Sequence, residues 1–311
     1  AYQWQSSTTG CSSGFTNISG ATSATYDPLP GLTTTTYYHR IVTSTLNGVT
    51  CSATSNCITV TVNNVSAGTV GSDQTICYQG DPAAFTVLTP ATGSGTLTYQ
   101  WQSSGTGCSG AWTNIPSATG PTYDPPTLSS TTYYHLVVTS TLNGRTCTAT
   151  TNCITVTVQG TVAPGNIGTN QTICYNTAPS QLVSVAPGWN GGGSGTISYI
   201  WESSTVSSTG PYSVILGANS VSYSPGPLST TTWYRRYTVS TLNGVSCVSI
   251  ATNVVSINVR AQLIPPVIGT SQAICYGETP NPIEIITNPT GGALPYTYQW
   301  QESPNGTAWT D

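Results

Sequence analysis

The chain has 311 residues, a formal net charge of −4 and only 5% charged residues, with five arginines and no lysine. So thin and scattered a charge argues against nucleic-acid binding, and no apolar run reaches the ~20 residues of a membrane-spanning helix, so neither partner is expected here. The 18 Tyr, 8 Trp and many alternating Val and Ile favour folded β-structure, although 95 residues are Ser or Thr.

A four-residue motif of the type Tyr-Gln-Trp-Gln marks four copies of one repeat. It stands at Tyr2–Gln5, Tyr99–Gln102, Tyr199–Glu202 and Tyr298–Gln301. The spacing predicts four modules, at 1–63, 64–160, 161–261 and 262–311. Since 1–63 holds only the C-terminal part of the repeat and 262–311 only the N-terminal part, we expect the sequence to be a section of a longer array.

The second copy is complete and predicts the strands of every copy. Thr96–Gln102 alternates with period two, and after a Gly-rich turn it is expected to form a hairpin with Ala111–Ile115. Farther on, Tyr133–Leu142 leads into Asn143-Gly144, and Asn-Gly between alternating strands is the strongest short hairpin signal. Ile154–Val158 then forms the last strand.

These short strands, without any helical periodicity, predict an all-β fold. The expected architecture is a tandem of immunoglobulin-like antiparallel β-sandwich modules of about 97–100 residues, arranged end to end. No Pro- or Ser-rich tether separates the modules, so a semi-rigid rod is expected. Neighbouring modules of the same chain are therefore the first expected partners.

The ten cysteines fall into two sets by their place in the repeat. One set follows Gln-Thr-Ile, or Gln-Ala-Ile in the fourth copy, or else the Asn-Gly turn, and we expect Cys77 to pair with Cys147 and Cys174 with Cys247. Cys51 and Cys275 are then expected to lack a partner in this sequence because their half of the repeat is missing. The second set predicts Cys11–Cys57 and Cys108–Cys153, which disappear together from the third copy.

The spacing of the cysteines favours disulfides over a zinc site. Zinc ligands cluster at short spacings such as C-x-x-C, and none occurs. An unpaired buried cysteine is the other alternative. Disulfides persist in oxidising compartments, so the chain is expected to be extracellular or exposed at a cell surface.

Catalytic chemistry is not expected. The two histidines, His39 and His135, share one repeat position that Arg235 occupies in the third copy, and they are interpreted as exposed strand residues. Only nine Asp and Glu occur in the whole chain, too few for a calcium site at each joint. We expect no enzyme activity, no metal and no cofactor.

Aromatic residues leave a sugar-binding alternative open. Trp4, Trp101, Trp201 and Trp300 are predicted core residues. The position of Trp112 is occupied by a different large aromatic residue in other copies, which favours a packing role there. Trp189, in a Gly-rich loop unique to the third copy, is the candidate for a surface contact.

The repeat resembles the immunoglobulin-like repeats of very large surface proteins of Bacteroidota, including the SprB-like gliding-motility adhesins. The resemblance rests on Tyr-Gln-Trp-Gln, Thr-Tyr-Asp-Pro, Thr-Thr-Tyr-Tyr-His, the Asn-Gly turn and Gln-Thr-Ile-Cys-Tyr. It implies type IX secretion, cell-surface exposure and a role as a stalk, filament or adhesin. The family offers no catalytic residues to carry over.

The leading hypothesis is therefore the structural repeat region of a giant secreted surface protein, a disulfide-stapled stalk or filament for adhesion or gliding motility. The alternative is a carbohydrate-binding module array of a larger secreted protein, with surface glycans or a substratum as partner. Edge strands rich in Thr and Val, with little charge, also predict lateral self-association.

Overall fold

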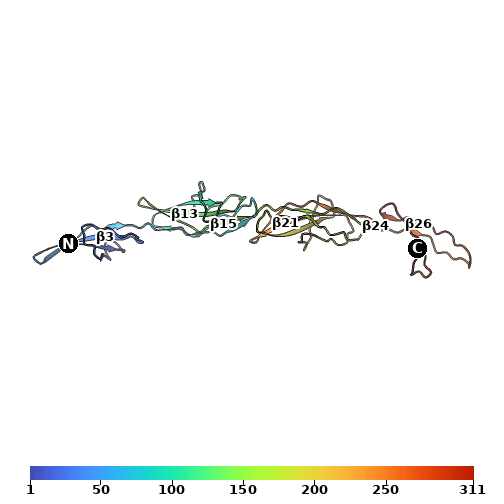
Figure 1. The fold of residues 1–311 in the computed structure, drawn as a ribbon, viewed down its shortest axis with the longest axis horizontal. Coiled ribbons are helices and arrows are strands. Elements are labelled where there is room, and N and C mark those ends of the chain that lie inside the picture. Colours follow the sequence, from blue (N-terminus) through green and yellow to red (C-terminus); the bar gives the residue numbers. More distant parts are fainter. The chain divides into compact units, whose positions relative to one another are not determined.

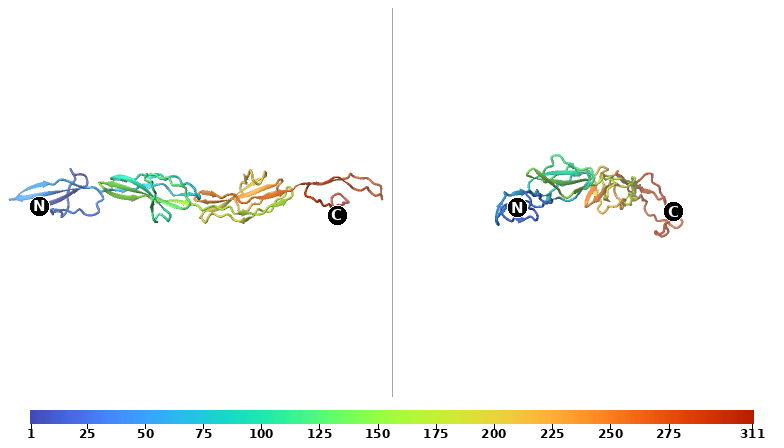
Figure 2. Two further views of the ribbon diagram at one scale, coloured as in Figure 1. Left: turned by 90° about the horizontal axis from the view of Figure 1, so that it is seen from above. Right: turned by 60° about the vertical axis from the view of Figure 1, so that its left-hand side comes forward.

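The computed structural model describes residues 1–311 and contains strands but no helix. It divides into two compact units, Ala1–Val158 and Gln159–Asp311, which are described separately. Each unit holds two of the four repeats. Figures 1 and 2 show the long strands β13 (Thr132–Leu142) and β21 (Thr232–Leu242) in two separate bundles of strands.

The first repeat contributes one sheet to the first unit. Its strands follow the order β2-β1-β3-β4, and β5 also pairs with β3. The bounds are β1 (Tyr2–Ser7), β2 (Thr16–Asn17), β3 (Thr36–Leu46), β4 (Val49–Thr54) and β5 (Ile58–Val60).

The second repeat is a two-layered sandwich. One layer is the sheet β12-β11-β13-β15-β8, with β14 also on β13, and the other layer is built from the short pairs β10-β6 and β7-β9. The bounds are β6 (Val65–Ser66), β7 (Thr69–Val70), β8 (Gln74–Ile76), β9 (Val87–Thr89), β10 (Thr92–Gly93), β11 (Thr96–Ser104), β12 (Thr113–Asn114), β13, β14 (Arg145–Thr150) and β15 (Ile154–Val158).

The second unit repeats this plan. The large sheet of the third repeat has the order β17-β23-β21-β19-β20, with β22 also paired to β21, and β16 pairs with β18. The fourth repeat contributes the two-stranded pairs β24-β27 and β25-β26. The bounds are β16 (Asn166–Ile167), β17 (Gln171–Ile173), β18 (Ser184–Ala186), β19 (Thr196–Ser204), β20 (Ser213–Val214), β21, β22 (Val245–Val248), β23 (Val255–Val259), β24 (Ala261–Ile264), β25 (Val267–Ile268), β26 (Ile285–Thr287) and β27 (Thr290–Gly292).

The Asn-Gly turn closes the longest hairpin of the first three repeats as predicted. Asn143 and Gly144 have φ values of 48° and 73°, and both central residues of a type I′ turn require positive φ. The turn puts Leu142 opposite Arg145, and the register continues to Ser140 opposite Cys147. We call the end of the repeat that carries this turn the hairpin end.

A tryptophan occupies the centre of each complete sandwich. Trp101 and Trp201 are fully buried, as predicted. In the second repeat the buried Phe85, which bridges Tyr123 through its backbone, lies 5.4 Å from the Trp101 ring, centroid to centroid. Leu182 takes the place of Phe85 in the third repeat and is equally buried. The indole N–H groups of both tryptophans donate to backbone carbonyls, so their polar atoms are satisfied.

Trp300 differs from its counterparts because it is 54% exposed. The fourth repeat in this sequence has no counterpart of β13 or β15 to pack against it. The tryptophan at this position is therefore fully buried only in the two complete repeats.

The first and last strands of the large sheet run parallel in both complete repeats. Ile76 of β8 lies level with Val158 of β15, and Ile173 of β17 lies level with Val259 of β23. Both strands therefore finish at the same end of the sandwich, opposite the hairpin end. We call it the C-terminal end, because the chain leaves the repeat there.

The architecture confirms the predicted fold class. The chain is all-β, and its repeats are immunoglobulin-like sandwiches in tandem. The structure contains the predicted last strand and the predicted Asn-Gly hairpin. It also contains the predicted hairpin of Thr96–Ser104 with Thr113–Asn114.

Removing the central ring of the third repeat should test this core. Trp201→Ala is expected to lower the free energy of opening of β21 by about 3–5 kcal/mol, because a large buried side chain is replaced by a cavity. Hydrogen exchange of β21 peptides measures this. Trp189→Ala, at a 58% exposed ring of the same repeat, is the control and should change it by less than ~0.5 kcal/mol. Equal effects of the two substitutions would contradict the assigned core.

Candidate functional site

The structure gathers no cluster of groups suited to catalysis. No group of three or more His, Cys, Asp or Glu side chains is placed to hold a metal ion. No helix in it has the length and apolarity to cross a bilayer. The candidate positions are therefore the cysteines, the His/Arg position, the residues at the joints between repeats, and the exposed aromatic rings.

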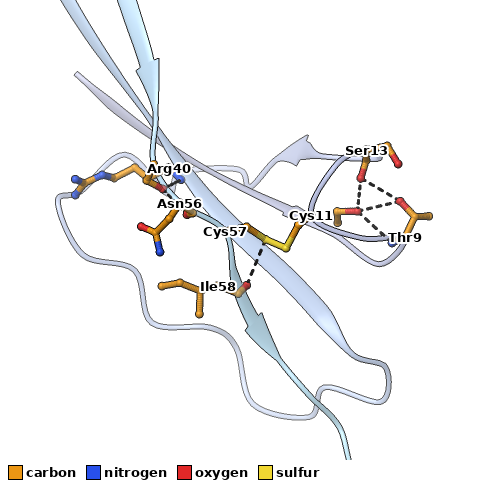
Figure 3. The surroundings of a disulfide bond; sticks show 9 residues. Thr9, Cys11, Ser13, Arg40, Asn56, Cys57 and Ile58 are labelled. Atoms are coloured by element: carbon orange, nitrogen blue, oxygen red, sulfur yellow. Dashed lines mark hydrogen bonds between the residues drawn. A yellow bond between two sulfur atoms is a disulfide. The ribbon is translucent and has the colours of Figure 1, made fainter.

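Two disulfides link a loop to the last strand of the first and second repeats. Cys11 bonds Cys57 and Cys108 bonds Cys153, each with a Cα–Cα distance of 5.8 Å. Figure 3 shows the first of them, with Cys57 beside Ile58 at the start of β5. Ile58 lies opposite Tyr38 in β3, the level expected from counting residues away from the Asn-Gly turn. The predicted pairing of this set is confirmed.

The predicted pairing of the other set is wrong. Cys147 and Cys174 are free thiols, as are Cys51 and Cys275, whereas Cys77 and Cys247 are disulfide-bonded. Neither Cys77–Cys147 nor Cys174–Cys247 can therefore exist.

The physical reason is the parallel pairing of the first and last strands. Cys77 follows Ile76 at the C-terminal end of the second repeat, whereas Cys147 lies in the hairpin at the other end. About ten strand residues separate their levels, or roughly 35 Å at ~3.4 Å per residue. A disulfide requires Cα atoms within ~7 Å. The sequence interpretation did not anticipate that the two strands run parallel.

The histidines are packed side chains rather than exposed ones, which corrects the sequence interpretation. His135 is only 9% exposed, and its ring stacks on Trp112 with centroids 3.7 Å apart. Its Nε2–H donates to Oε1 of Gln102 over 2.6 Å. His39 repeats this arrangement with Phe15 and Gln5. The preference for any large ring at the Trp112 position follows, because the ring covers the histidine.

The third repeat replaces this neutral pair by an ion pair of the same geometry. Arg235 stands at the histidine position, and its Nη2 lies 2.7 Å from Oε2 of Glu202. The guanidinium carbon lies 4.0 Å from the centroid of the Tyr212 ring. Histidine with Gln and arginine with Glu thus perform one packing role, and neither arrangement provides a nucleophile or a metal site.

A buried arginine in the third repeat was not predicted from the sequence. Arg236 is fully buried, and its guanidinium carbon lies 4.5 Å from the centroid of the Tyr199 ring. Burial lowers its pKa, while Tyr199 acts in the opposite direction. Its guanidinium donates to the carbonyls of Val221 and Pro164. Leu136 occupies this place in the second repeat, so the buried charge is not a requirement of the fold.

A polar residue shortly after the last strand of a repeat is bonded to the hairpin that follows. In the first unit, Nδ2 of Asn63 donates to the carbonyls of Ser140 (2.8 Å) and Arg145 (3.1 Å). The Ser140 hydroxyl donates back to Oδ1 of Asn63 over 2.6 Å. The sequence interpretation missed this residue, although a polar amide at the same place in two copies was a usable signal.

Gln159 makes the equivalent bonds in the second unit. It is 3% exposed, and its Nε2 donates to the carbonyl of Val245 over 2.9 Å. Its Oε1 accepts from the Ser240 hydroxyl over 3.0 Å. The amide side chain therefore satisfies the same two strands of the hairpin whether it is Asn or Gln.

Trp189 combines a fixed backbone with an exposed ring. Its backbone N–H and carbonyl are both hydrogen-bonded to Ala163. The sequence predicted a Gly-rich loop here, but the backbone of Trp189 is held by this bridge. Its side chain is 58% exposed. The position can present a ring to solvent, which is the property required of a surface contact.

Comparison with known proteins places the chain in one family. A family model described as a domain of unknown function, DUF8696, matches residues 1–64, 66–160, 163–261 and 265–311. The chain belongs to this family. No curated protein matches it.

Among solved structures, the chain is similar to three N-terminal domains of the bacteriophage RB49 highly immunogenic outer capsid protein. The identity is 10% and the TM-score 0.41, over 83% of this chain and 88% of that one. It is also similar to a variant of titin domains I67–I69, at 9% identity and a TM-score of 0.33 over 73% and 75%. Extracellular domains 3–5 of Drosophila OTK match at 10% identity and 0.31 over 73% and 70%.

Loss of the loop disulfide should weaken only the repeat that contains it. The double substitution Cys108→Ser and Cys153→Ser is expected to lower the free energy of opening of β13 by about 2–4 kcal/mol, because it releases a loop of 45 residues. Hydrogen exchange of β13 peptides measures the change. The third repeat has no such pair, so β21 peptides in the same sample should stay unchanged, and a parallel loss there would refute the assignment.

Protonation of His135 should destabilise the second repeat. Burial lowers the pKa of His135 below its ordinary value, so the unfolded chain binds the proton more readily. Stability is then complete above the unfolded pKa of ~6.5 and falls as the pH drops below it. Urea denaturation of the chain and of His135→Gln at pH 7.5 and pH 5 measures this, and the wild type should lose more stability on acidification than the variant. An identical loss in both would contradict it.

Proposed function

We propose that the chain is the structural repeat region of a large secreted surface protein, forming a disulfide-stapled stalk or filament for adhesion or gliding motility. The observation that carries this proposal is the joint at Asn63 within the first unit. Asn63 stands three residues after the end of β5, and its side chain is hydrogen-bonded to the hairpin of the second repeat. Gln159 makes the equivalent bonds inside the second unit. A joint whose polar groups are satisfied in this way restricts bending between the first and second repeats, which is the property a stalk requires.

The absence of site chemistry in the described chain supports the same proposal. The residues at repeated positions exchange freely among chemically different types, as His135 and Arg235 do, provided that packing is kept. Such exchange is compatible with a structural role and incompatible with a shared catalytic group. The proposal therefore assigns no enzymatic activity to this region.

Location outside the cell is part of the proposal. Loop disulfides in two repeats suit an oxidising compartment. The repeat motifs resemble those of Bacteroidota surface adhesins of the SprB-like type, which supports export by the type IX route.

A second candidate function rests on Trp189. An exposed ring on a fixed backbone can stack on a sugar, so the third repeat could serve as a carbohydrate-binding module. The stalk proposal expects no appreciable binding on a glycan array. Binding that Trp189→Ala abolishes would favour the second candidate instead.

Electron microscopy and small-angle scattering of the purified chain test the stalk. We expect a narrow distribution of angles between the first and second repeats, at the joint that holds Asn63. Asn63→Ala should broaden this distribution, because the hydrogen bonds to Ser140 and Arg145 are lost. Asn63→Gln is the matched control, since glutamine makes the equivalent bonds at position 159. Freely jointed or globular particles in the wild type would contradict the proposal.

A further inference from the structure

The third repeat fills a pocket of its sandwich with an arginine of its own. Arg236 stands opposite Trp201 in the strand register and is fully buried. Its guanidinium carbon lies 4.5 Å from the centroid of the Tyr199 ring. Its nitrogens donate to the carbonyls of Val221 and Pro164. An aromatic face and two carbonyl oxygens therefore hold this guanidinium group.

The first repeat has an arginine at the same position. Arg40 stands opposite Trp4, and its guanidinium carbon lies 4.6 Å from the centroid of the Tyr2 ring. Its Nη1 donates to the carbonyl of Ala24. Ala24 and Val221 each follow the residue whose carbonyl accepts from the indole N–H of the core tryptophan. The same two kinds of contact therefore recur around an arginine in two repeats.

The second repeat leaves this place open. Leu136 stands where Arg236 stands in the third repeat, and it lines a cavity of about 240 Å³, which we call the Leu136 cavity. This volume is several times the ~30 Å³ that a water molecule occupies in the liquid. Tyr99, Ala67 and Pro121 also line the cavity. They are the counterparts of the three residues that hold the guanidinium of Arg236.

The local backbone supports this equivalence. Ala67 and Pro164 each precede a glycine whose φ is 70°. Pro121 follows the residue whose carbonyl accepts from the buried indole N–H, as Val221 does in the third repeat. The backbone that supplies the two carbonyls therefore has the same course in both repeats.

One further exchange favours an external donor in the second repeat. In the third repeat, Oγ1 of Thr238 donates to the carbonyl of Pro164 over 3.0 Å, beside the donor from the arginine. Val138 takes the place of Thr238 in the second repeat, and its side chain has no group to donate to the carbonyl of Ala67. An N–H group from outside the repeat can take up this acceptor.

The Leu136 cavity opens at the surface of a repeat with an excess of negative charge. Thr69, Pro90 and Pro121 line it and are exposed, whereas Leu136 itself is buried. Residues 64–160 contain three aspartates, one arginine, no glutamate and no lysine, so their formal charge is −2. A positively charged side chain can therefore approach favourably and enter from solvent.

We propose that the Leu136 cavity binds the guanidinium group of an arginine side chain that a partner protein presents. The Tyr99 ring covers one face of the guanidinium, and the carbonyls of Ala67 and Pro121 accept from its N–H groups. Arginine is preferred to lysine because a planar group with several donors matches a ring and two separate carbonyls. This binding role goes beyond the stalk and does not depend on it.

Methyl NMR of the full chain, labelled with ¹³C on its Leu and Val methyl groups, tests the proposal. The probe is the blocked peptide acetyl-Gly-Arg-Gly-amide. We expect it to shift the methyl signals of Leu136, Val70 and Val87, all of which line the cavity. The same peptide with the neutral analogue citrulline in place of arginine should bind at least about tenfold more weakly, because the cation–π contact is lost. Absence of these shifts, or equal affinity for the two peptides, would overturn the proposal.

Leu136→Arg should block the cavity from within, as Arg236 does in the third repeat. The third repeat shows that the fold accepts arginine at this position. We expect the peptide-induced shifts of Val70 and Val87 to disappear in this variant. Retention of the wild-type affinity in folded Leu136→Arg would contradict the assigned site.

Tyr99→Leu is a second variant, at a half-buried position, and keeps the test decisive if Leu136→Arg does not fold. It should weaken peptide binding about tenfold through loss of the ring face. Trp189→Ala, which removes a ring of the third repeat, is the control and should bind as the wild type does. Unchanged affinity in Tyr99→Leu would refute the proposal. Shifts of Val70 and Val87 on dilution of the chain without peptide would also refute it, because the occupant would then be a second copy.

Discussion

The parallel pairing of the first and last strands determines what each end of the repeat can do. Because Ile76 lies level with Val158, the segment that begins the large sheet finishes where the chain leaves the repeat. The Asn-Gly hairpin is consequently left at the opposite end. A repeat built in this way has two chemically distinct ends, and its array has a direction. The joint residues and the positions of the end cysteines both follow from that single arrangement.

Covalent support differs from repeat to repeat. The loop disulfides fasten a surface loop to the start of the last strand inside the first and second repeats. The third repeat lacks this cysteine pair and still forms the same large sheet. The bond therefore supports the sandwich without defining its fold.

The sequence predicted those features that depend on local chemistry. Asn143-Gly144 requires positive φ, the alternating strands around Trp101 require one buried face, and the joint loss of two cysteines indicates a bond. The first two signals lie within a few residues of the structure that they determine. The third is visible when the copies of the repeat are compared. The core, the hairpin and the loop disulfides were therefore predictable.

The errors arose where the outcome depends on long-range strand order. Nothing local to Cys77 shows that its strand runs parallel to Val156–Val158, so the two cysteines of one repeat were assigned to each other although they lie at opposite ends. His135 is covered by Trp112, which lies just before β12. Arg236 is covered by Tyr199 of the neighbouring strand β19. Such contacts become visible only when the sheet is assembled.

The central claim is that Asn63, just past the last strand of the first repeat, fastens the hairpin of the second repeat through its side-chain amide. It is tested most directly by hydrogen exchange of β13 and β14 peptides in the wild type and in Asn63→Ala. We predict faster exchange around Ser140 and Arg145 in Asn63→Ala, and exchange close to that of the wild type in Asn63→Gln, because glutamine makes the equivalent bonds at position 159. Unchanged exchange in Asn63→Ala would contradict the account.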